Sequence, residues 1–137
     1  MLNPSTADAS VDDPTIRRCV DFSRSWGFAE LVVCNLYAYR ATQTVDLFLA
    51  QEAGFDIVGP ENREWMRNAM IDARAVVAAW GNGAAGDLAL RTARETAQDL
   101  HCLGRTARGR PKHPLYVPKG TALSLYARAG EVVPPCA

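Results

Sequence analysis

The sequence predicts a single α/β domain, and three observations lead to this fold class. Two apolar runs, residues 31–36 and 75–80, are continuous rather than alternating, which is typical of strands covered on both faces. Stretches with apolar residues at helical spacing precede and follow these runs. Polar side chains and glycines come directly after each run, as in folds that bind ligands at the carboxyl ends of parallel strands. We therefore expect residues 1–137 to form one three-layer α/β/α sandwich around a short, mostly parallel sheet.

The composition indicates a soluble globular protein, because apolar residues make up 48% of the chain and charged residues 22%. Fifteen basic residues balance fifteen acidic ones, so any surface for nucleic acid must be a local basic patch. No charged-then-apolar leader is present and no apolar run is long enough to span a membrane, so we expect a cytoplasmic protein without a membrane partner. The scattered cysteines favour buried free thiols over a zinc or iron–sulfur site that uses distant cysteines, and no cofactor is expected: Cys19, Cys34, Cys102 and Cys136.

Four helices are predicted from caps and apolar spacing. Asp13 is an N-cap for the first, with Pro14 in its first turn, and Gly27 marks its end. The others are expected near residues 46–53, from Pro60 onward, and from about 84 to 100. The third helix is expected to turn Trp65, Met66, Ala69, Met70 and Ala73 inward, and the fourth Leu88, Leu90, Ala93 and Ala97.

Strands are expected at 31–36, 75–80 and 101–104, with a very short one at the start of the chain. Met1 and Leu2 are too few for a buried strand, so either this strand is unusually short or the true chain starts further upstream. Pro4 holds Asn3 in an extended conformation where this strand becomes a loop. The tail, residues 127–137, is expected to be poorly ordered.

Four strand ends carry the residues that could do chemistry, and a parallel sheet brings such ends to one crevice. They are Asn3-Pro4-Ser5, Asn35 with the loop 37–42, the stretch from Trp80 to Gly83, and the basic loop 105–112 that leads to His113. Phosphate-loop, nucleophile-elbow and HExxH motifs are absent from the sequence, and Gly81-Asn82-Gly83 lacks the third glycine of a dinucleotide fingerprint.

Each of these residues also has a structural interpretation. Asn3 could bond its own backbone in an Asx turn, and the amide of Asn35 could bond backbone as readily as a ligand. Trp80 is more often a core residue than a stacking platform, and His113 is more often a hydrogen-bonding loop residue than a catalyst. Asp8 could orient a water or cap a turn. The basic side chains could contact phosphates or simply be solvated: Arg105, Arg108, Arg110, Lys112 and, further away, Lys119.

Several sequence blocks, in order, resemble one family of bacterial and phage proteins. These blocks are MLNPSTAD, DDPTIRRC, VVCNLYAYRAT, GPEN, AWGN, LHCLG and HPLYVP. Over about residues 1–118 they resemble the domain of unknown function 1643. Members of that family usually carry more chain before the MLNPS block, including the rest of a first strand.

More distantly, the order of blocks resembles the uracil-DNA glycosylase superfamily, which implies that fold and a set of roles. By this resemblance Asn3 positions the attacking water, Asn35 reads the base edge, and His113 donates to the base carbonyl. The chain departs from that superfamily at two positions: Ser5 stands where the glycosylase loop has glycine for backbone approach to the base, and Leu115 stands where a serine hydroxyl would contact a phosphate.

The resemblance implies a DNA glycosylase-like hydrolase that cleaves the N-glycosidic bond of a damaged or modified base, in DNA or in a free nucleoside or nucleotide. Asp8 would assist the water as a carboxylate near Asn3. The alternatives are a non-catalytic module that binds a nucleotide or modified base, and a subunit that a partner completes. The expected substrate pocket is Pro4, Ser5, Asn35, Tyr37, Tyr39, Arg40, Trp80 and Asn82, with DNA phosphates at Arg105, Arg108, Arg110 and Lys112.

Overall fold

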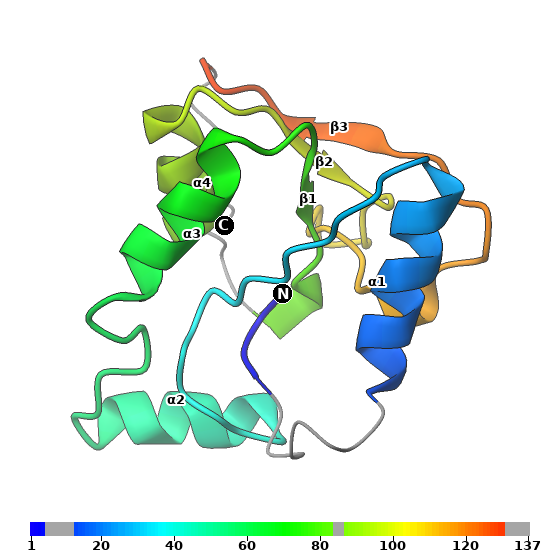
Figure 1. Ribbon diagram of the computed structural model, residues 1–137. Coiled ribbons are helices and arrows are strands. Elements are labelled where there is room, and N and C mark those ends of the chain that lie inside the picture. Colours follow the sequence, from blue (N-terminus) through cyan, green and yellow to red (C-terminus); the bar gives the residue numbers. More distant parts are fainter. Residues whose placement is uncertain (5–12, 84–86, 131–137) are drawn as a thin grey trace.

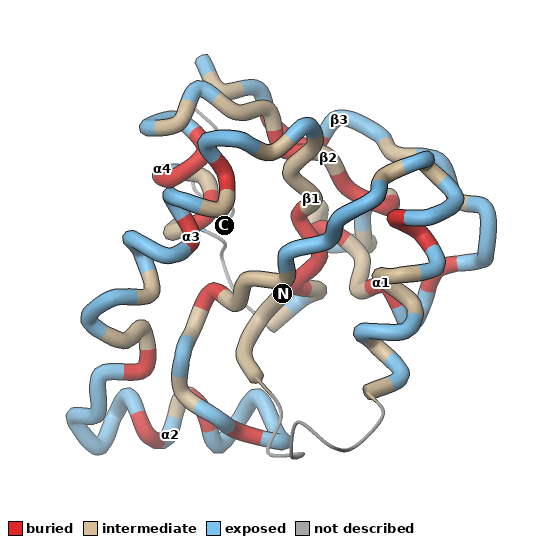
Figure 2. Tube along the Cα trace, in the orientation of Figure 1, coloured by how far each residue is buried: buried red, intermediate tan, exposed pale blue. Residues whose placement is uncertain are grey.

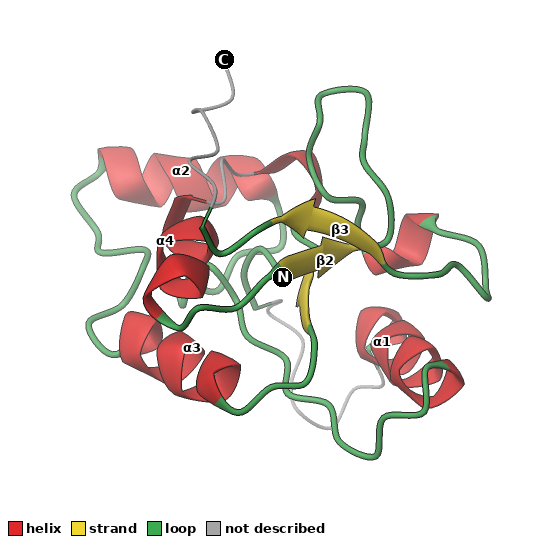
Figure 3. Ribbon diagram, turned by 90° about the horizontal axis from the view of Figure 1, so that it is seen from above, coloured by secondary structure: helices red, strands yellow, loops and turns green. Residues whose placement is uncertain are grey.

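The structure is a computed structural model that describes residues 1–4, 13–83 and 87–130. It is a mixed α/β domain (Figure 1), in which a small sheet lies between α1 on one side and α3 with α4 on the other (Figure 3). The α helices are α1 (Pro14–Ser25), α2 (Thr44–Glu52), α3 (Asn62–Ile71) and α4 (Asp87–Glu95), and two short 3₁₀ helices are η1 (Gly81–Gly83) and η2 (Pro114–Tyr116).

The sheet has the order β1 (Val76–Ala78), β2 (Leu100–Cys102), β3 (Ser124–Ala127). β1 and β2 are parallel, with Val76 opposite Leu100, and β3 is antiparallel to β2. The sheet is therefore mixed, and β3 was not predicted, because its outer residues are exposed and its sequence carries no continuous apolar run. Disorder from residue 127 onward is wrong for residues 127–130, since Ala127 ends β3 and the Ala129 amide donates to Asp99 Oδ1 at 2.9 Å. Residues 131–137 lie outside the described part of the chain.

The predicted strand 31–36 is not a strand in the structure. Leu31 and Val32 are 40% and 61% exposed, so the apolar run is not covered on both faces. Its end does run beside the amino terminus: the Met1 nitrogen donates to the Cys34 carbonyl at 2.8 Å, and the Leu36 amide donates to the Met1 carbonyl at 3.0 Å. Because a strand needs a partner along its whole length, the two residues before Asn3 organise only the last part of this run.

The four predicted helices are present, and the ends of α1 follow the expected signals, whereas α3 begins at Asn62 rather than at Pro60 and α4 ends at Glu95 rather than near residue 100. The Asp13 side chain accepts from the Thr15 amide at 2.7 Å at the start of α1, and Gly27 follows its end with φ 79°. Two inward-facing assignments are wrong. Trp65 on α3 is 69% exposed, because the buried face of this helix is made by Met66 and Met70. Ala97 lies beyond α4 and is exposed, with φ 53°, in the left-handed turn that ends the helix.

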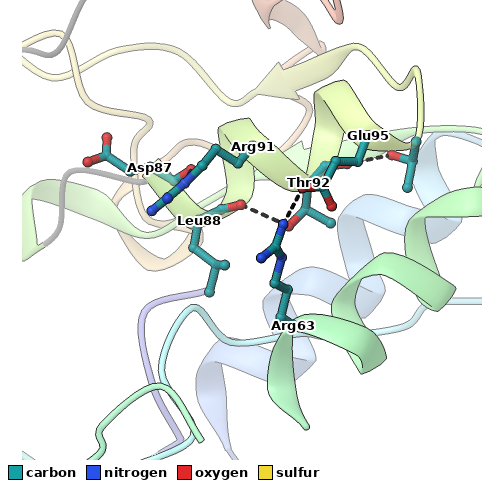
Figure 4. A network of polar contacts seen from close by, with 7 residues as sticks. Arg63, Asp87, Leu88, Arg91, Thr92 and Glu95 are labelled. Carbon is teal, nitrogen blue, oxygen red and sulfur yellow. Dashed lines mark hydrogen bonds and ion pairs between the residues drawn. The ribbon is translucent and has the colours of Figure 1, made fainter. Parts of the chain in front are cut away.

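The main core lies where α3 and α4 pack on the sheet (Figure 2). Met66 and Met70 from α3 meet Ala89 and Ala93 from α4 and Leu100 from β2. At the surface of this helix pair, Arg63 on α3 forms an ion pair with Glu95 on α4 (Figure 4). Within α4, the buried Thr92 hydroxyl donates back to the Leu88 carbonyl at 2.9 Å, so its polar atom has a partner inside the helix.

Smaller clusters hold α1 and α2 in place. Phe22 of α1 packs with Leu103 and Val117, and Leu47 of α2 packs with Ile57. None of the helices in the described ranges is long and apolar enough to cross a membrane.

Candidate functional site

The four strand-end segments predicted to converge do meet in the structure. The Asn3 amide group donates to the Ala41 carbonyl at 2.8 Å, which joins the amino terminus to the loop 37–42. A Cβ placed on Gly83 would lie 2.6 Å from Leu2 Cδ2, so η1 packs directly on the amino terminus. The Gly81 amide donates to the Pro111 carbonyl at 2.9 Å, which joins η1 to the basic loop. We use the name strand-end crevice for this junction of residues 2–4, 35–41, 80–83 and 105–113, after the crevice that the sequence predicts; the contacts above are what define it.

Asn3 acts as a clamp inside this crevice. Besides Ala41, its Nδ2 donates to the carbonyls of Pro4 at 3.0 Å and Tyr39 at 3.5 Å. The Ala41 amide returns a bond to the Pro4 carbonyl at 3.4 Å. The carboxamide is therefore fixed in orientation by backbone, and Oδ1 is its remaining polar atom.

Asn35 sits at the other side of the same loop and is half-buried. Its backbone carbonyl and that of Leu36 both accept from Asn62 Nδ2, at 3.0 and 3.1 Å. The side-chain amide of Asn35 has no hydrogen bond to another described residue. Asn62 at the start of α3 thus holds the segment that carries Asn35, a role that the sequence pattern does not reveal.

The aromatic residues of the predicted pocket differ in burial and in their neighbours. Trp80 is 3% exposed and its ring meets Tyr126 edge-on at 5.7 Å, so it is a core residue; its Nε1 is buried without a partner among the described residues. Tyr37 is half-buried against Phe48, and burial, together with the negative charge of Asp87, raises its pKa. Tyr39 lies beside Phe55, with ring centroids 6.2 Å apart. Trp80 is thus buried in the core, whereas the two tyrosines are half-buried on the loop 37–42.

His113 caps η2, and its surroundings affect which ring nitrogen carries a proton and at what pH the ring becomes charged. Its Nδ1 accepts from the Leu115 amide at 3.4 Å. Burial, followed by the positive charge of the Met1 amino group, lowers the pKa of His113, and the Asp13 carboxylate opposes this shift. A Cβ placed on Gly81 would lie 3.7 Å from the His113 Cβ, so the residue beside the imidazole is one that carries no side chain. Asp13, known from sequence only as a helix cap, therefore also acts on this histidine.

The basic loop, residues 105–112, is a tight turn whose basic side chains differ in their partners and in their exposure. Thr106 and Gly109 close it through backbone bonds, and the Thr106 hydroxyl donates to Asn82 Oδ1 at 2.8 Å. Arg105 donates to the Tyr126 carbonyl at 2.6 Å and its guanidinium lies 4.5 Å over the Tyr126 ring, so its charge is used within the protein. Arg108 is exposed at the tip, and Arg110 and Lys112 are half-buried.

The amino group of Met1 lies beside two thiols in the interior. Burial lowers the pKa of the Met1 α-ammonium to about 6, and burial raises the pKa values of Cys19 and Cys34. Both cysteines and Cys102 are free thiols, and the described residues contain no group of three side chains that could hold a metal ion. Ser5, Asp8 and Cys136, which the sequence analysis singled out, lie outside the described residues.

Comparison with known families assigns the chain. Residues 1–115 match the family described as "Protein of unknown function (DUF1643)". The chain belongs to the DUF1643 family. This DUF1643 protein matches no curated protein and no solved structure, so the likeness to uracil-DNA glycosylases has no support from these comparisons.

Proposed function

We propose that the strand-end crevice binds a nucleobase and that this DUF1643 protein is a DNA glycosylase-like hydrolase of the N-glycosidic bond. The observation that carries the proposal is the state of His113. Because Nδ1 accepts a backbone N–H, a neutral imidazole must carry its proton on Nε2. Because its pKa is lowered, the ring is neutral at pH 7. His113 is thus a neutral hydrogen-bond donor, as a carbonyl oxygen that gains negative charge requires.

The surroundings of His113 suit a flat ligand. Gly81 beside it carries no side chain, which leaves room for the edge of a base. Tyr37 and Tyr39 are half-buried on the loop 37–42, and aromatic rings of this kind can stack on a base. The exposed Arg108 and Arg40 are the cations best placed to meet phosphates, whereas Arg105 is already bound to Tyr126.

The chemical step follows from these groups. A water attacks C1′ of the sugar, the bond from C1′ to the base nitrogen breaks, and its electron pair leaves with the base. His113 Nε2–H stabilises the negative charge that develops on the base carbonyl. Asn3 Oδ1 orients the water by accepting one of its hydrogens, and the proton that the water loses passes to solvent or to Asp8.

A non-catalytic nucleobase-binding module is the second candidate. It is favoured because neither Asn3 nor Asp13 is a free base that could remove a proton from the water. The Nδ2 of Asn3 is fully engaged with backbone carbonyls, and an amide cannot remove a proton from water. Asp13, the carboxylate whose charge acts on His113, accepts a backbone bond as the cap of α1. In this candidate the same donors hold the base without cleavage.

Base release from duplex and single-stranded oligonucleotides that carry uracil, mismatched or modified bases distinguishes the two candidates. Mass spectrometry detects the freed base, and equilibrium binding is measured on the same panel. His113→Ala should lower release by roughly 100-fold or more, the usual effect of losing one such donor. Arg67→Ala, at an exposed cation on α3 that belongs to none of these segments, should leave release unchanged. Saturable binding without product would establish the module. A folded protein that neither binds nor cleaves any substrate of the panel would refute the proposal.

A further inference from the structure

Charge is distributed unevenly along the chain, and α2 lies in a stretch that contains no basic residue. Residues 41–62 carry four acidic side chains and no lysine or arginine, whereas residues 100–130 carry six lysines and arginines and no acidic residue. The four acidic side chains are all exposed: Asp46, Glu52, Asp56 and Glu61. A surface of this sign repels nucleic acid and anionic membranes and attracts basic partners.

α2 carries apolar side chains on its outer side as well as on its inner side, and five of its nine residues are apolar. Leu47 and Ala50 are buried, and buried positions alternate with exposed ones along the helix (Figure 2). Val45 and Leu49, which lie one turn apart on the other side, are each more than half exposed. Figure 1 shows α2 at the lower edge of the domain, away from the sheet. Because a helix that is apolar all round is usually buried all round, the outer side of α2 suits a further layer.

An acidic residue completes this outer side at the end of the helix. Val45, Leu49 and Glu52 follow one another at spacings of four and three residues, so they share one face of α2. Glu52 is the last residue of α2, where the negative end of the helix dipole disfavours a carboxylate, and the last turn holds no basic residue. No described residue forms an ion pair with Glu52. Glu52 therefore destabilises α2 in the isolated domain, and a cation brought to this face by a partner would offset that effect.

We propose that the outer face of α2, made by Val45, Asp46, Leu49 and Glu52, docks a basic amphipathic helix of a partner protein. The apolar side chains of that helix pack on Val45 and Leu49, as side chains do between paired helices. Its lysines and arginines lie beside Asp46 and Glu52, where the charges are opposite.

Charge decides among the possible occupants of this face. Nucleic acid and anionic bilayers have the same sign as residues 41–62 and are repelled. A second copy docked through the same face by two-fold symmetry would bring Asp46 and Glu52 close to the same acidic side chains of the other copy. A basic amphipathic helix supplies both the apolar side chains and the opposite charge that the face lacks.

The proposal is tested with a synthetic peptide of about 15 residues made of leucine and lysine, with the leucines at helical spacing on one side. A control peptide has glutamate in place of every lysine. Isothermal titration calorimetry measures the affinity of each peptide for the full chain, and ¹H–¹⁵N NMR shows which amides respond. Sedimentation of the chain without peptide shows whether it self-associates.

The lysine peptide should perturb the amides of residues 44–56, and the glutamate peptide should bind at least tenfold more weakly. Leu49→Lys should weaken binding of the lysine peptide at least tenfold. Its matched control is Ile71→Lys, which adds the same charge at an exposed apolar residue of α3 and should leave binding unchanged. Glu52→Gln should weaken binding about threefold and at the same time raise the urea midpoint, because it removes a charge that the helix dipole disfavours.

Equal losses in Leu49→Lys and Ile71→Lys would show that only net charge matters, and would overturn the proposal. Equal binding of the glutamate peptide, or NMR perturbations centred outside α2, would overturn it as well. Self-association that Leu49→Lys abolishes would make a second copy the occupant in place of a partner helix. A lower urea midpoint in Glu52→Gln would mean that this carboxylate serves α2 itself, which contradicts the argument for a docked cation.

Discussion

The buried amino group of Met1 makes the stability of the protein depend on pH in a defined window. The pKa of this group is lowered from 8.0 to about 6 because burial disfavours its charge. The unfolded chain therefore binds more protons than the folded one between these values, so stability must rise as pH rises through the window. A difference of two pKa units corresponds to a change of about 2.7 kcal/mol in the free energy of unfolding once the whole window has been crossed.

N-terminal acetylation is the matched control for this effect. The acetylated nitrogen no longer titrates but keeps an N–H that can donate to the Cys34 carbonyl. Burial also lowers the pKa of His113, which adds a rise in stability at the acid end in both forms. Burial raises the pKa values of Cys19 and Cys34 above an ordinary thiol value of 9.0, so their effects, which lower stability, lie above the window.

Urea unfolding at half-unit intervals from pH 5.5 to 8.5, followed by circular dichroism, measures this dependence. The free amine should gain up to about 2.7 kcal/mol more than the acetylated chain across the window. Parallel curves for the two forms would refute the argument, because they would mean that the amino group has the same pKa in both states.

Three substitutions test the packing and the turns, each by urea unfolding. Leu47→Ala, at a side chain that is 0% exposed, should cost about 2–5 kcal/mol, and a loss below 1 kcal/mol would contradict the packing around α2. Asn62→Ala removes both bonds to the Asn35 and Leu36 carbonyls and should cost about 2 kcal/mol; an unchanged midpoint would show that water replaces them. Ala97→Gly should stabilise by about 1 kcal/mol, because φ 53° strains any residue with a Cβ, and a loss of stability would contradict that turn.

The helices follow from the sequence because their signals are local. Asp13, Pro14 and Gly27 bracket α1 by capping chemistry that does not depend on the rest of the chain. The run 31–36 shows the limit of such reasoning, because an apolar stretch becomes a strand only beside a partner. β3 escaped prediction for a related reason: an edge strand with exposed residues has no composition that separates it from a loop.

The convergence of the candidate site could be predicted from topology, whereas individual roles could not. Asn3 and His113 lie in segments that contact one another through their neighbours, but the bonds of Asn3 to Tyr39 and Ala41 depend on a loop more than thirty residues away. The sequence predicts that Arg105 contacts a phosphate. In the structure Arg105 instead binds the carbonyl and the ring of Tyr126 on β3, a strand that was not predicted. Long-range partners of this kind leave no periodicity in the sequence.

The neutral donor state of His113, on which the proposed nucleobase site rests, is tested most directly by ¹⁵N NMR of the imidazole rings. The chain has two histidines, so a His101→Gln variant assigns the signals. At pH 7 the His113 ring should show a protonated Nε2 and an unprotonated Nδ1, and it should remain neutral at pH values below the ordinary histidine pKa of 6.5. An imidazolium at pH 7, or a proton on Nδ1, would contradict the donor role and the nucleobase site built on it.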